Sequence, residues 1–534
     1  MSNFSRSQFV RKHVSATRTG IVAAQHRTAA EAGAAVLADG GDAVDAAIAT
    51  SFALGVVEPW MSGAAGGGAM TIWREDEGKA YTIPFGMRSP AGLDPAHYPL
   101  AGNGKFSDLF AWPAVKDDRN VRGATAIAVP GTVAGMELAH QRYGTLSWRE
   151  LLMPAVGLAR QGMLVDWYAS LLIASTAREL AKDPDAAAMF LEDGQWPIIA
   201  TWTALTSKRL DQRILAETLV RLAEAGPRDF YEGDIAASLV ADIVEKGGCL
   251  SRKDLAAYRA RLTPTIELPY RGGVVHAAEG LTAGANLVEC LAMMEAAFTP
   301  AATPDGNSFA ETARALGKVY TRRLNEMGDI EAPHAPACTT HFSVVDAKGN
   351  MCAVTQTLLS IFGSRVVSPS TGLLMNNGIM WFDAEPGKPN SLGPGKACLM
   401  NVCPAIGEKY GRRFAIGASG GRKILPAVVN LISFMMDFDM SLEEAFHHPR
   451  IDNCGGPAII ADEDLSPDIL QALDAVGPML TTKRTVFPYA FACPAGVMRA
   501  GGMNMGCTEI TSPWGDAVDE SSGFRARQAA RIST

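Results

Sequence analysis

The feature that most constrains the fold is a pair of apolar, β-branched runs separated by a short turn. Residues 342–346 alternate as a strand does, residues 347–350 form the turn, and residues 351–358 give a second apolar run. This pattern predicts a β-hairpin. Thr339 and Thr340 stand where the first strand begins. A hydroxyl in such a place is usually a hydrogen-bonded structural group, so these residues alone indicate no chemistry.

The rest of the chain alternates helical patterns with short strands and glycine-rich turns. Apolar spacing predicts helices over 28–37, 43–54, 133–143, 148–161, 207–225, 286–296 and 309–325, and strands over 69–74 and 414–417. The glycine-rich run 59–68 lacks the lysine and hydroxyl residue of a phosphate-binding loop. Close backbone packing is therefore the better interpretation of this run.

Four further motifs occur in a fixed order around the hairpin. They lie at residues 40–47, 129–135, 372–377 and 417–421. Together with the threonines, this set resembles the gamma-glutamyltransferase family of N-terminal-nucleophile hydrolases, from about Gly20 to beyond Arg450. The resemblance implies an α+β fold, a four-layer αββα sandwich with a helical periphery.

The resemblance also implies a self-cleaving precursor, cut between Cys338 and Thr339. Residues 1–338 would form the large subunit region and 339–534 the small one, the two together making one αββα unit. The cut has a chemical reason, because a threonine hydroxyl is a poor nucleophile until a base takes its proton. A free α-amine, with a reference pKa of about 7.7–8.0, can be that base, whereas a backbone amide cannot.

Thr357, Gly420 and Gly421 complete the catalytic set that the resemblance implies. Folding the hairpin about Lys348 and Gly349 brings Thr357 back within about one residue of Thr339. The pattern does not fix the register, and a slip of one residue would put Thr357 on the other face of the sheet. Adjacent glycines can turn two backbone N–H groups toward one point, as an oxyanion hole requires. Taken alone, a strand threonine and a Gly-Gly pair are far more often structural.

His341 and Asp346 invite a different interpretation, a serine-type triad built on the same strand. We give it little weight, because a histidine two residues beyond the nucleophile shares its face of the strand but points along the sheet. Relatives in the family carry a histidine there without using it as the base.

The positions that bind the α-amine and α-carboxylate of the γ-glutamyl donor in the family are altered in this chain. Those that the resemblance places around the substrate are Gly86, Leu359, Gly378, Trp381, Met400 and Asn401. A buried ammonium or carboxylate without partners would carry a desolvation cost of several kcal/mol. Ordinary γ-glutamyl donors are therefore expected to bind poorly.

The replacements suggest a more apolar acyl pocket, with Phe362 as a further apolar candidate and Asn401 as a polar contact. Arg88, Arg365 and Arg422 could each reach a carboxylate, although surface or structural roles are commoner for arginines.

Composition limits which binding partners and which cellular compartment we expect. The net charge of −8 over 534 residues argues against nucleic acid and anionic membranes. No apolar segment follows the basic residues near the N-terminus, so no signal peptide and no membrane span are expected. The nine cysteines have no paired metal spacing and indicate buried, reduced thiols. We expect a cytoplasmic protein without metal or cofactor, and homo-oligomer formation stays open.

The leading hypothesis is a self-processing amide hydrolase that acts on a small-molecule acyl amide lacking the glutamyl head. The alternative within the family is a genuine γ-glutamyl hydrolase or transferase with displaced ligands. The alternative from another class is an unprocessed, non-catalytic scaffold.

Overall fold

Two seven-stranded antiparallel sheets form the centre of the protein. The computed structural model describes residues 10–102, 112–200, 203, 208–327 and 338–522. The first sheet has the order β21 (Asp516–Asp519), β2 (Ile21–Ala24), β10 (Cys338–Val345), β11 (Met351–Leu359), β3 (Gly67–Arg74), β4 (Lys79–Phe85), β7 (Thr263–Pro264). The second has the order β1 (Ser15–Thr17), β20 (Met503–Thr508), β19 (Cys493–Ala500), β15 (Arg412–Ser419), β14 (Ala405–Lys409), β9 (Gly273–Ala277), β8 (Ile266–Tyr270).

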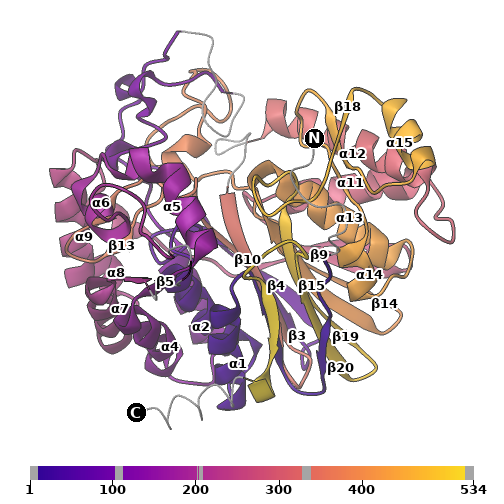
Figure 1. The fold of residues 1–534 in the computed structure, drawn as a ribbon, viewed down its shortest axis with the longest axis horizontal. Coiled ribbons are helices and arrows are strands. Elements are labelled where there is room, and N and C mark those ends of the chain that lie inside the picture. Colours follow the sequence, from indigo (N-terminus) through magenta and orange to yellow (C-terminus); the bar gives the residue numbers. More distant parts are fainter. Residues whose placement is uncertain (1–9, 103–111, 201–202, 204–207, 328–337, 523–534) are drawn as a thin grey trace.

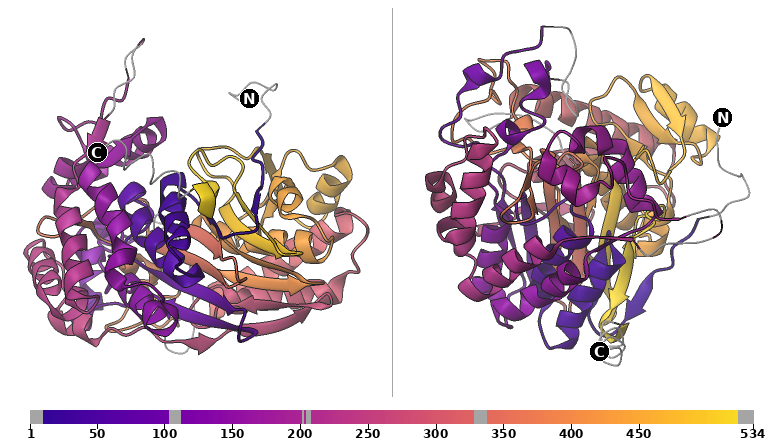
Figure 2. Two further views of the ribbon diagram at one scale, coloured as in Figure 1. Left: turned by 90° about the horizontal axis from the view of Figure 1, so that it is seen from below. Right: turned by 60° about the vertical axis from the view of Figure 1, so that its left-hand side comes forward.

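Helices cover the outer face of each sheet, and in Figure 1 the helices of the N-terminal half lie on the opposite side from α11 to α15. On the first sheet lie α1 (Arg27–Ala38), α2 (Ala43–Val57) and α3 (Thr132–Tyr143), with α4 (Trp148–Gln161), α7 (Arg213–Ala225), α8 (Asp229–Glu232), α9 (Asp234–Glu245) and α10 (Arg252–Ala257) outside them. On the second sheet lie α11 (Gly284–Ala297) and α13 (Ile424–Met436), flanked by α12 (Gly306–Glu326), α14 (Leu442–His447) and α15 (Pro467–Asp474). The predicted α+β, four-layer αββα architecture is therefore confirmed (Figure 2).

Smaller elements fill the periphery. Helices α5 (Trp167–Leu180) and α6 (Pro184–Phe190) stand beside the two-stranded sheet of β5 (Met163–Val165) and β6 (Lys208–Leu210). A second pair joins β12 (Val367–Ser368) to β13 (Leu373–Leu374), and a three-stranded sheet joins β16 (Ile451–Asp452), β17 (Ile459–Asp462) and β18 (Met479–Thr482). In the described part of the chain, no helix is both long and apolar enough to cross a membrane.

The inner faces of the sheets pack directly on one another. Val345 and Met351 of the hairpin share an apolar cluster with Ile406, Ala415 and Val497 of the second sheet. A side chain at Gly417 of β15 would collide with the imidazole ring of His341 on β10. Strands β10 and β15 therefore face each other across the centre of the sandwich.

Most predicted elements are observed, and one is wrong in part. The hairpin is formed by β10 and β11, and α1 ends as expected, with Gly40 at a φ of +92° just beyond it. The helix predicted from residue 207 begins only at Arg213, because Lys208–Leu210 pairs with β5 as a strand. That pairing is a tertiary contact, which overrides the local helical preference.

Candidate active site

Thr339 lies at the start of the central strand β10. Its side chain is fully buried, and its Oγ1 has no hydrogen-bond partner among the described residues. The register shifts at this point, because Cys338 opposes Leu359 whereas Thr340 opposes Gln356. Such a bulge re-aims a side chain and is often found beside functional sites. A buried hydroxyl left unpaired is itself unusual and suggests a functional role.

Thr357 lies opposite this bulge on β11, within about one residue of Thr339 as predicted. Its Oγ1 accepts a hydrogen bond from the Leu359 backbone N–H at 2.8 Å. A side chain at Gly66 would collide with the carbonyl oxygen of Thr357. The glycine-rich run therefore serves close backbone packing against β11, as the sequence suggested.

Gly420 and Gly421 follow β15 directly and take positive φ values of +133° and +65°. A Cβ at Gly420 would lie 2.9 Å from the Cα of Ala492. Both positions therefore favour glycine, and the turn leads into α13.

The glycine turn and Thr339 lie toward the same end of the sandwich. Arg413, near the start of β15, stacks 3.9 Å over the Trp73 ring, and Trp73 pairs with Met351 beside the hairpin turn. The start of β15 is therefore at the turn end of the hairpin. Its other end, with Gly420, points toward the end where Thr339 begins β10.

His341 does not form a triad with Asp346. Its Nδ1 lies 2.8 Å from Thr355 Oγ1 and its Nε2 lies 3.0 Å from Ser343 Oγ. Burial lowers the pKa of His341 to about 3, so the ring is neutral at ordinary pH. Asp346 instead accepts backbone N–H groups of the hairpin turn, among them that of Gly349 at 2.8 Å.

Three of the predicted substrate-binding residues lie in one apolar cluster. Leu359, Trp381 and Met400 are buried together with Met87. A Cβ at Gly86 would lie 2.8 Å from the Cε of Met400, so the methionine side chain covers the glycine. Gly378 packs under the same group, where a Cβ would meet Ala128 at 2.6 Å.

Phe362 lies elsewhere, which corrects its expected place in this pocket. Its ring packs 5.6 Å from that of Trp60 and 5.0 Å from that of Phe190. Positive φ values at Leu359 (+89°) and Phe362 (+61°) turn the chain between them and separate their side chains.

Two of the three arginines considered as carboxylate ligands, Arg88 and Arg365, donate to main-chain carbonyls. Arg88 is exposed and donates to the Gly395 carbonyl at 2.7 Å. Arg365 donates to the Gly363 carbonyl at 2.7 Å, and Arg422 is half-buried just after the glycine turn.

Asn401 contacts a buried arginine that the sequence analysis overlooked. Arg323 of α12 is 1% exposed, and its Nη2 donates to Asn401 Oδ1 at 2.9 Å and to the Met400 carbonyl at 3.0 Å. Burial lowers the pKa of Arg323 to about 10. One helical turn earlier, the Tyr320 hydroxyl donates to the Arg422 carbonyl. The sequence did contain an indication that Arg323 is buried, because it continues the helical spacing of the apolar residues Leu316 and Tyr320.

Glu58 is a second ionisable group that the sequence analysis overlooked. It is 4% exposed at the end of α2, and its Oε2 has no hydrogen-bond partner within the described ranges. Burial raises its pKa to about 8. The loop that follows is bound to the chain beyond Thr357, since the Met61 carbonyl accepts the Leu358 N–H at 3.0 Å.

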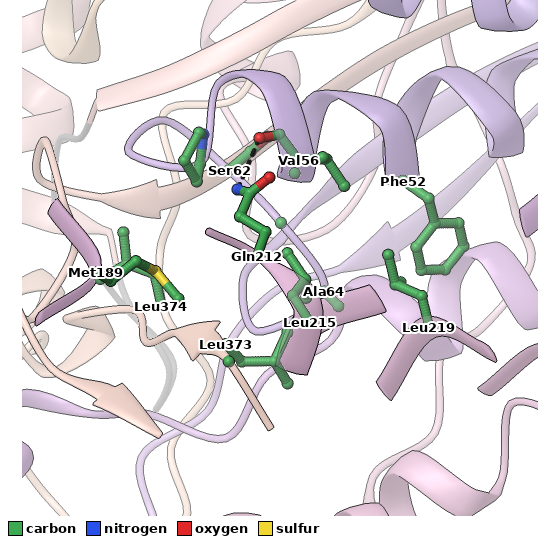
Figure 3. A pocket seen from close by; sticks show the side chains of 14 residues that line it. Phe52, Val56, Ser62, Ala64, Met189, Gln212, Leu215, Leu219, Leu373 and Leu374 are labelled. Atoms are coloured by element: carbon green, nitrogen blue, oxygen red, sulfur yellow. Dashed lines mark hydrogen bonds between the residues drawn. The ribbon is translucent and has the colours of Figure 1, made fainter. Parts of the chain in front are cut away.

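A cavity on the helical side of the first sheet is too small for an acyl substrate. It lies between α2, α7 and β13, encloses about 20 Å³, and is lined mainly by apolar side chains such as Phe52, Leu215 and Leu373 (Figure 3). Gln212 donates to the Val56 carbonyl at 3.0 Å, and its Oε1 finds no partner within the described chain. This volume suits about one water molecule.

The described residues were also searched for metal sites and disulfides. None of their His, Cys, Asp and Glu side chains gather in groups of three or more that could hold a metal ion. The structure describes the side chains of eight cysteines; no two of these eight form a disulfide, and six are buried, as the sequence indicated.

Two inner antiparallel sheets between helical layers, with a buried threonine at the start of a central strand, define the class of N-terminal-nucleophile hydrolases. The family model for gamma-glutamyltranspeptidase matches residues 29–338 and 331–493. The chain belongs to the gamma-glutamyltranspeptidase family, as its motifs predicted.

Relatives of two kinds are similar to the chain. The Acylase ACY 1 proenzyme of Pseudomonas sp. strain V22 is 35% identical over 497 residues, covering 86% of each protein. The glutathione hydrolase proenzyme of Escherichia coli K12 is 31% identical over 527 residues, covering 89% of this chain and 88% of the relative. The crystal structure of cephalosporin acylase from Bacillus halodurans has the same fold, with a TM-score of 0.80 at 23% identity, covering 97% of this chain and 99% of that one.

Proposed function

We propose that the chain is a self-processing amide hydrolase whose nucleophile is Thr339 and whose substrates are acyl amides without an amino-acid head. The observation that carries this proposal is the buried hydroxyl of Thr339 at the start of β10, which has no hydrogen-bond partner among the residues that the structure describes. It lies toward the end of the sandwich that holds two glycines with left-handed backbones.

Processing would precede catalysis. Thr339 Oγ attacks the carbonyl carbon of Cys338, the peptide C–N bond breaks, and water hydrolyses the resulting ester. This separates residues 1–338 from 339–534 and frees the α-amine of Thr339. Both sequence relatives are named as proenzymes, which supports this step.

The mature residue then acts as nucleophile and base together. Its α-amine takes the hydroxyl proton while Oγ bonds to the substrate carbonyl carbon, and the N–H groups of Gly420 and Gly421 hold the oxyanion. The C–N bond breaks as the ammonium protonates the leaving amine. Water, deprotonated by the same amine, hydrolyses the acyl ester and releases the carboxylic acid. Thr357 supports the nucleophile from the neighbouring strand.

The apolar cluster at the predicted substrate-binding positions supports a substrate other than a γ-glutamyl amide. Met400 fills the space above Gly86, and Leu359 and Trp381 close around it in one apolar cluster. An α-ammonium or α-carboxylate would be desolvated there, at a cost of several kcal/mol per ion. The relationship to Acylase ACY 1 is consistent with such a pocket.

The similarity to glutathione hydrolase keeps γ-glutamyl transfer or hydrolysis as a second candidate. Rates on pentanoyl p-nitroanilide and γ-glutamyl p-nitroanilide separate the two, since efficient turnover of the second alone would overturn the acyl-amide proposal.

Two neighbouring threonines provide the matched variants. Thr339→Ala should remain a single band near 56.5 kDa and be inactive. Thr340→Ala should still process and hydrolyse, because the Thr340 hydroxyl donates instead to Gln25 Oε1 at 3.3 Å. A wild-type chain that never yields two fragments would support a non-catalytic scaffold.

A further inference from the structure

Lys423 places a positive charge at the N-terminus of helix α13. It is the N-cap residue of that helix and the second residue after Gly421 of the glycine turn. The N-terminal end of a helix carries a partial positive charge, so a cation there is unfavourable on its own. The ammonium group must therefore be held in place by partners.

Two oxygens hold the ammonium of Lys423. Its Nζ donates to the carbonyl of Ala490 at 2.5 Å and lies 3.4 Å from Oδ2 of Asp452. Asp452 is 3% exposed, and its Oδ1 has no hydrogen-bond partner within the described ranges. Burial raises the pKa of this carboxyl, and the nearby ammonium opposes that shift. Each charge would be costly in this place without the other, so the two residues form a unit.

Asp452 is fixed to the same helix that Lys423 caps. The backbone N–H and carbonyl of the preceding residue, Ile451, bind the side-chain amide of Asn430 at 3.4 Å and 3.3 Å. Asn430 comes seven residues, or about two turns, after Lys423, so both lie on one side of α13. Strand β16, which contains Asp452, is therefore tied to this side of the helix.

The carbonyl that Lys423 binds belongs to the segment behind the glycine turn. Ala490 comes two residues before Ala492, whose Cα would lie 2.9 Å from a Cβ at Gly420. The backbone of residues 490–492 therefore packs closely on the turn. Lys423 joins the two backbones that meet at Gly420, because it belongs to the first and hydrogen-bonds to the second.

We infer that Lys423 is a positioning residue that holds residues 490–492 against Gly420. Asp452 is the counter-ion that keeps the ammonium in place. Close contact with this segment limits how the turn can move, so the N–H groups of the turn stay directed at the oxyanion. Such donors act mainly in the transition state, so their alignment should affect kcat more than KM. This inference rests on the proposed amide hydrolysis and adds two residues to it.

Kinetics of the processed variants on pentanoyl p-nitroanilide test the inference. Lys423→Met keeps the length of the side chain but loses its charge and its donor. Its kcat, normalised to the processed fraction, should fall by about tenfold to a hundredfold with little change in KM. Lys423→Arg keeps charge and donor and should recover most of the rate, and Asp452→Asn should fall between the two. A kcat within about threefold of wild type in Lys423→Met, or in Asp452→Asn should the first variant not fold, would overturn the inference.

A double variant and a matched lysine separate positioning from general stabilisation. Lys423→Met and Asp452→Asn act on one contact, so their combination should lower kcat no further than Lys423→Met alone. Losses that multiply would contradict the role given to Asp452. Lys409→Met is the control, since Lys409 is 7% exposed and donates to Asp439 and to the Met436 carbonyl at the other end of α13. It should lower the free energy of unfolding and leave kcat and KM unchanged. An equal loss of kcat in this variant would overturn the inference.

Butylboronic acid gives a readout that does not depend on turnover. Its boron takes the place of the substrate carbonyl carbon and bonds to Thr339 Oγ, while the hydroxyl proton passes to the α-amine. The tetrahedral boronate so formed carries an oxygen where the oxyanion would lie. In calorimetry, Lys423→Met should bind butylboronic acid about tenfold more weakly than wild type, and pentanoate equally well. Equal affinities for the boronic acid would overturn the inference. A wild type that binds it but hydrolyses no acyl anilide would contradict the proposed function alone.

Discussion

Substitution of Gly420 by alanine tests the oxyanion hole most sharply. At a φ of +133° a residue with a side chain is strained, at a cost of about 1–3 kcal/mol. The new methyl group would also lie 2.9 Å from the Cα of Ala492, so one of the two backbones must move. In the proposed mechanism, either response would turn the N–H groups of the glycine turn away from the oxyanion.

The expected loss follows from the worth of one such donor. Removing it typically costs about 2.7–4 kcal/mol, or about 10²–10³ in kcat. We therefore expect Gly420→Ala to lower kcat on acyl p-nitroanilides by that factor, normalised to the processed fraction, with little change in KM. Self-cleavage should slow as well, because it passes through its own oxyanion.

Gly456→Ala is the control for this experiment. Gly456 is exposed, and the nearest atom to a Cβ there is 4.0 Å away, so the variant should keep its rate and its processing. A Gly420→Ala enzyme that folds and retains kcat within about threefold of wild type would refute the oxyanion-hole assignment.

Three further substitutions probe the surroundings of the site. Glu58→Gln should remove a pH dependence of the free energy of unfolding. The Glu58 carboxyl stays protonated in the folded protein up to a pKa of about 8, but it ionises from about 4.5 in the unfolded chain. The free energy of unfolding of the wild type should therefore fall by roughly 1 kcal/mol per pH unit between those two values. Urea unfolding in the single-chain Thr339→Ala background measures this, and equal slopes with and without Glu58 would contradict it. Gly66→Ala should displace the Thr357 carbonyl and slow processing, visible on a gel time course; normal processing would show that this contact does not position the strand. His341→Phe should lower the free energy of unfolding by about 1–3 kcal/mol by leaving two buried hydroxyls unpaired. The acid limb of the wild-type pH–rate profile should follow the α-amine near pH 7.7–8.0, and a limb at lower pH would point to another base.

The hairpin was predictable because its signal, two apolar runs about one turn, is local. Its register was not: folding about Lys348 and Gly349 would pair His341 with Gln356, whereas the structure pairs His341 with Thr355, one residue away. The αββα layers were predicted from the family resemblance that the order of motifs carries; local patterns could not predict them, because each sheet combines strands from both halves of the chain. The strand Lys208–Leu210 was not predictable, because its partner, β5, lies more than forty residues earlier in the sequence.

Only those residues of the candidate site that are glycines or belong to a sequence motif could be predicted from the sequence. The sequence shows that Gly86 and Met400 are unusual, whereas their direct contact appears only in the fold. Arg323 and Glu58 are buried because of the elements that pack around them, and the local sequence does not show which elements those are. Phe362 was misplaced because two positive φ values reverse the chain after β11.

The identity of the first residue of the small fragment tests the central claim most directly. N-terminal sequencing of an active, processed preparation should read Thr339, Thr340, His341, Phe342, Ser343. A small fragment that begins at any other residue, or full activity from an uncut chain, would contradict the account, because the hydroxyl and the amine could no longer belong to one residue.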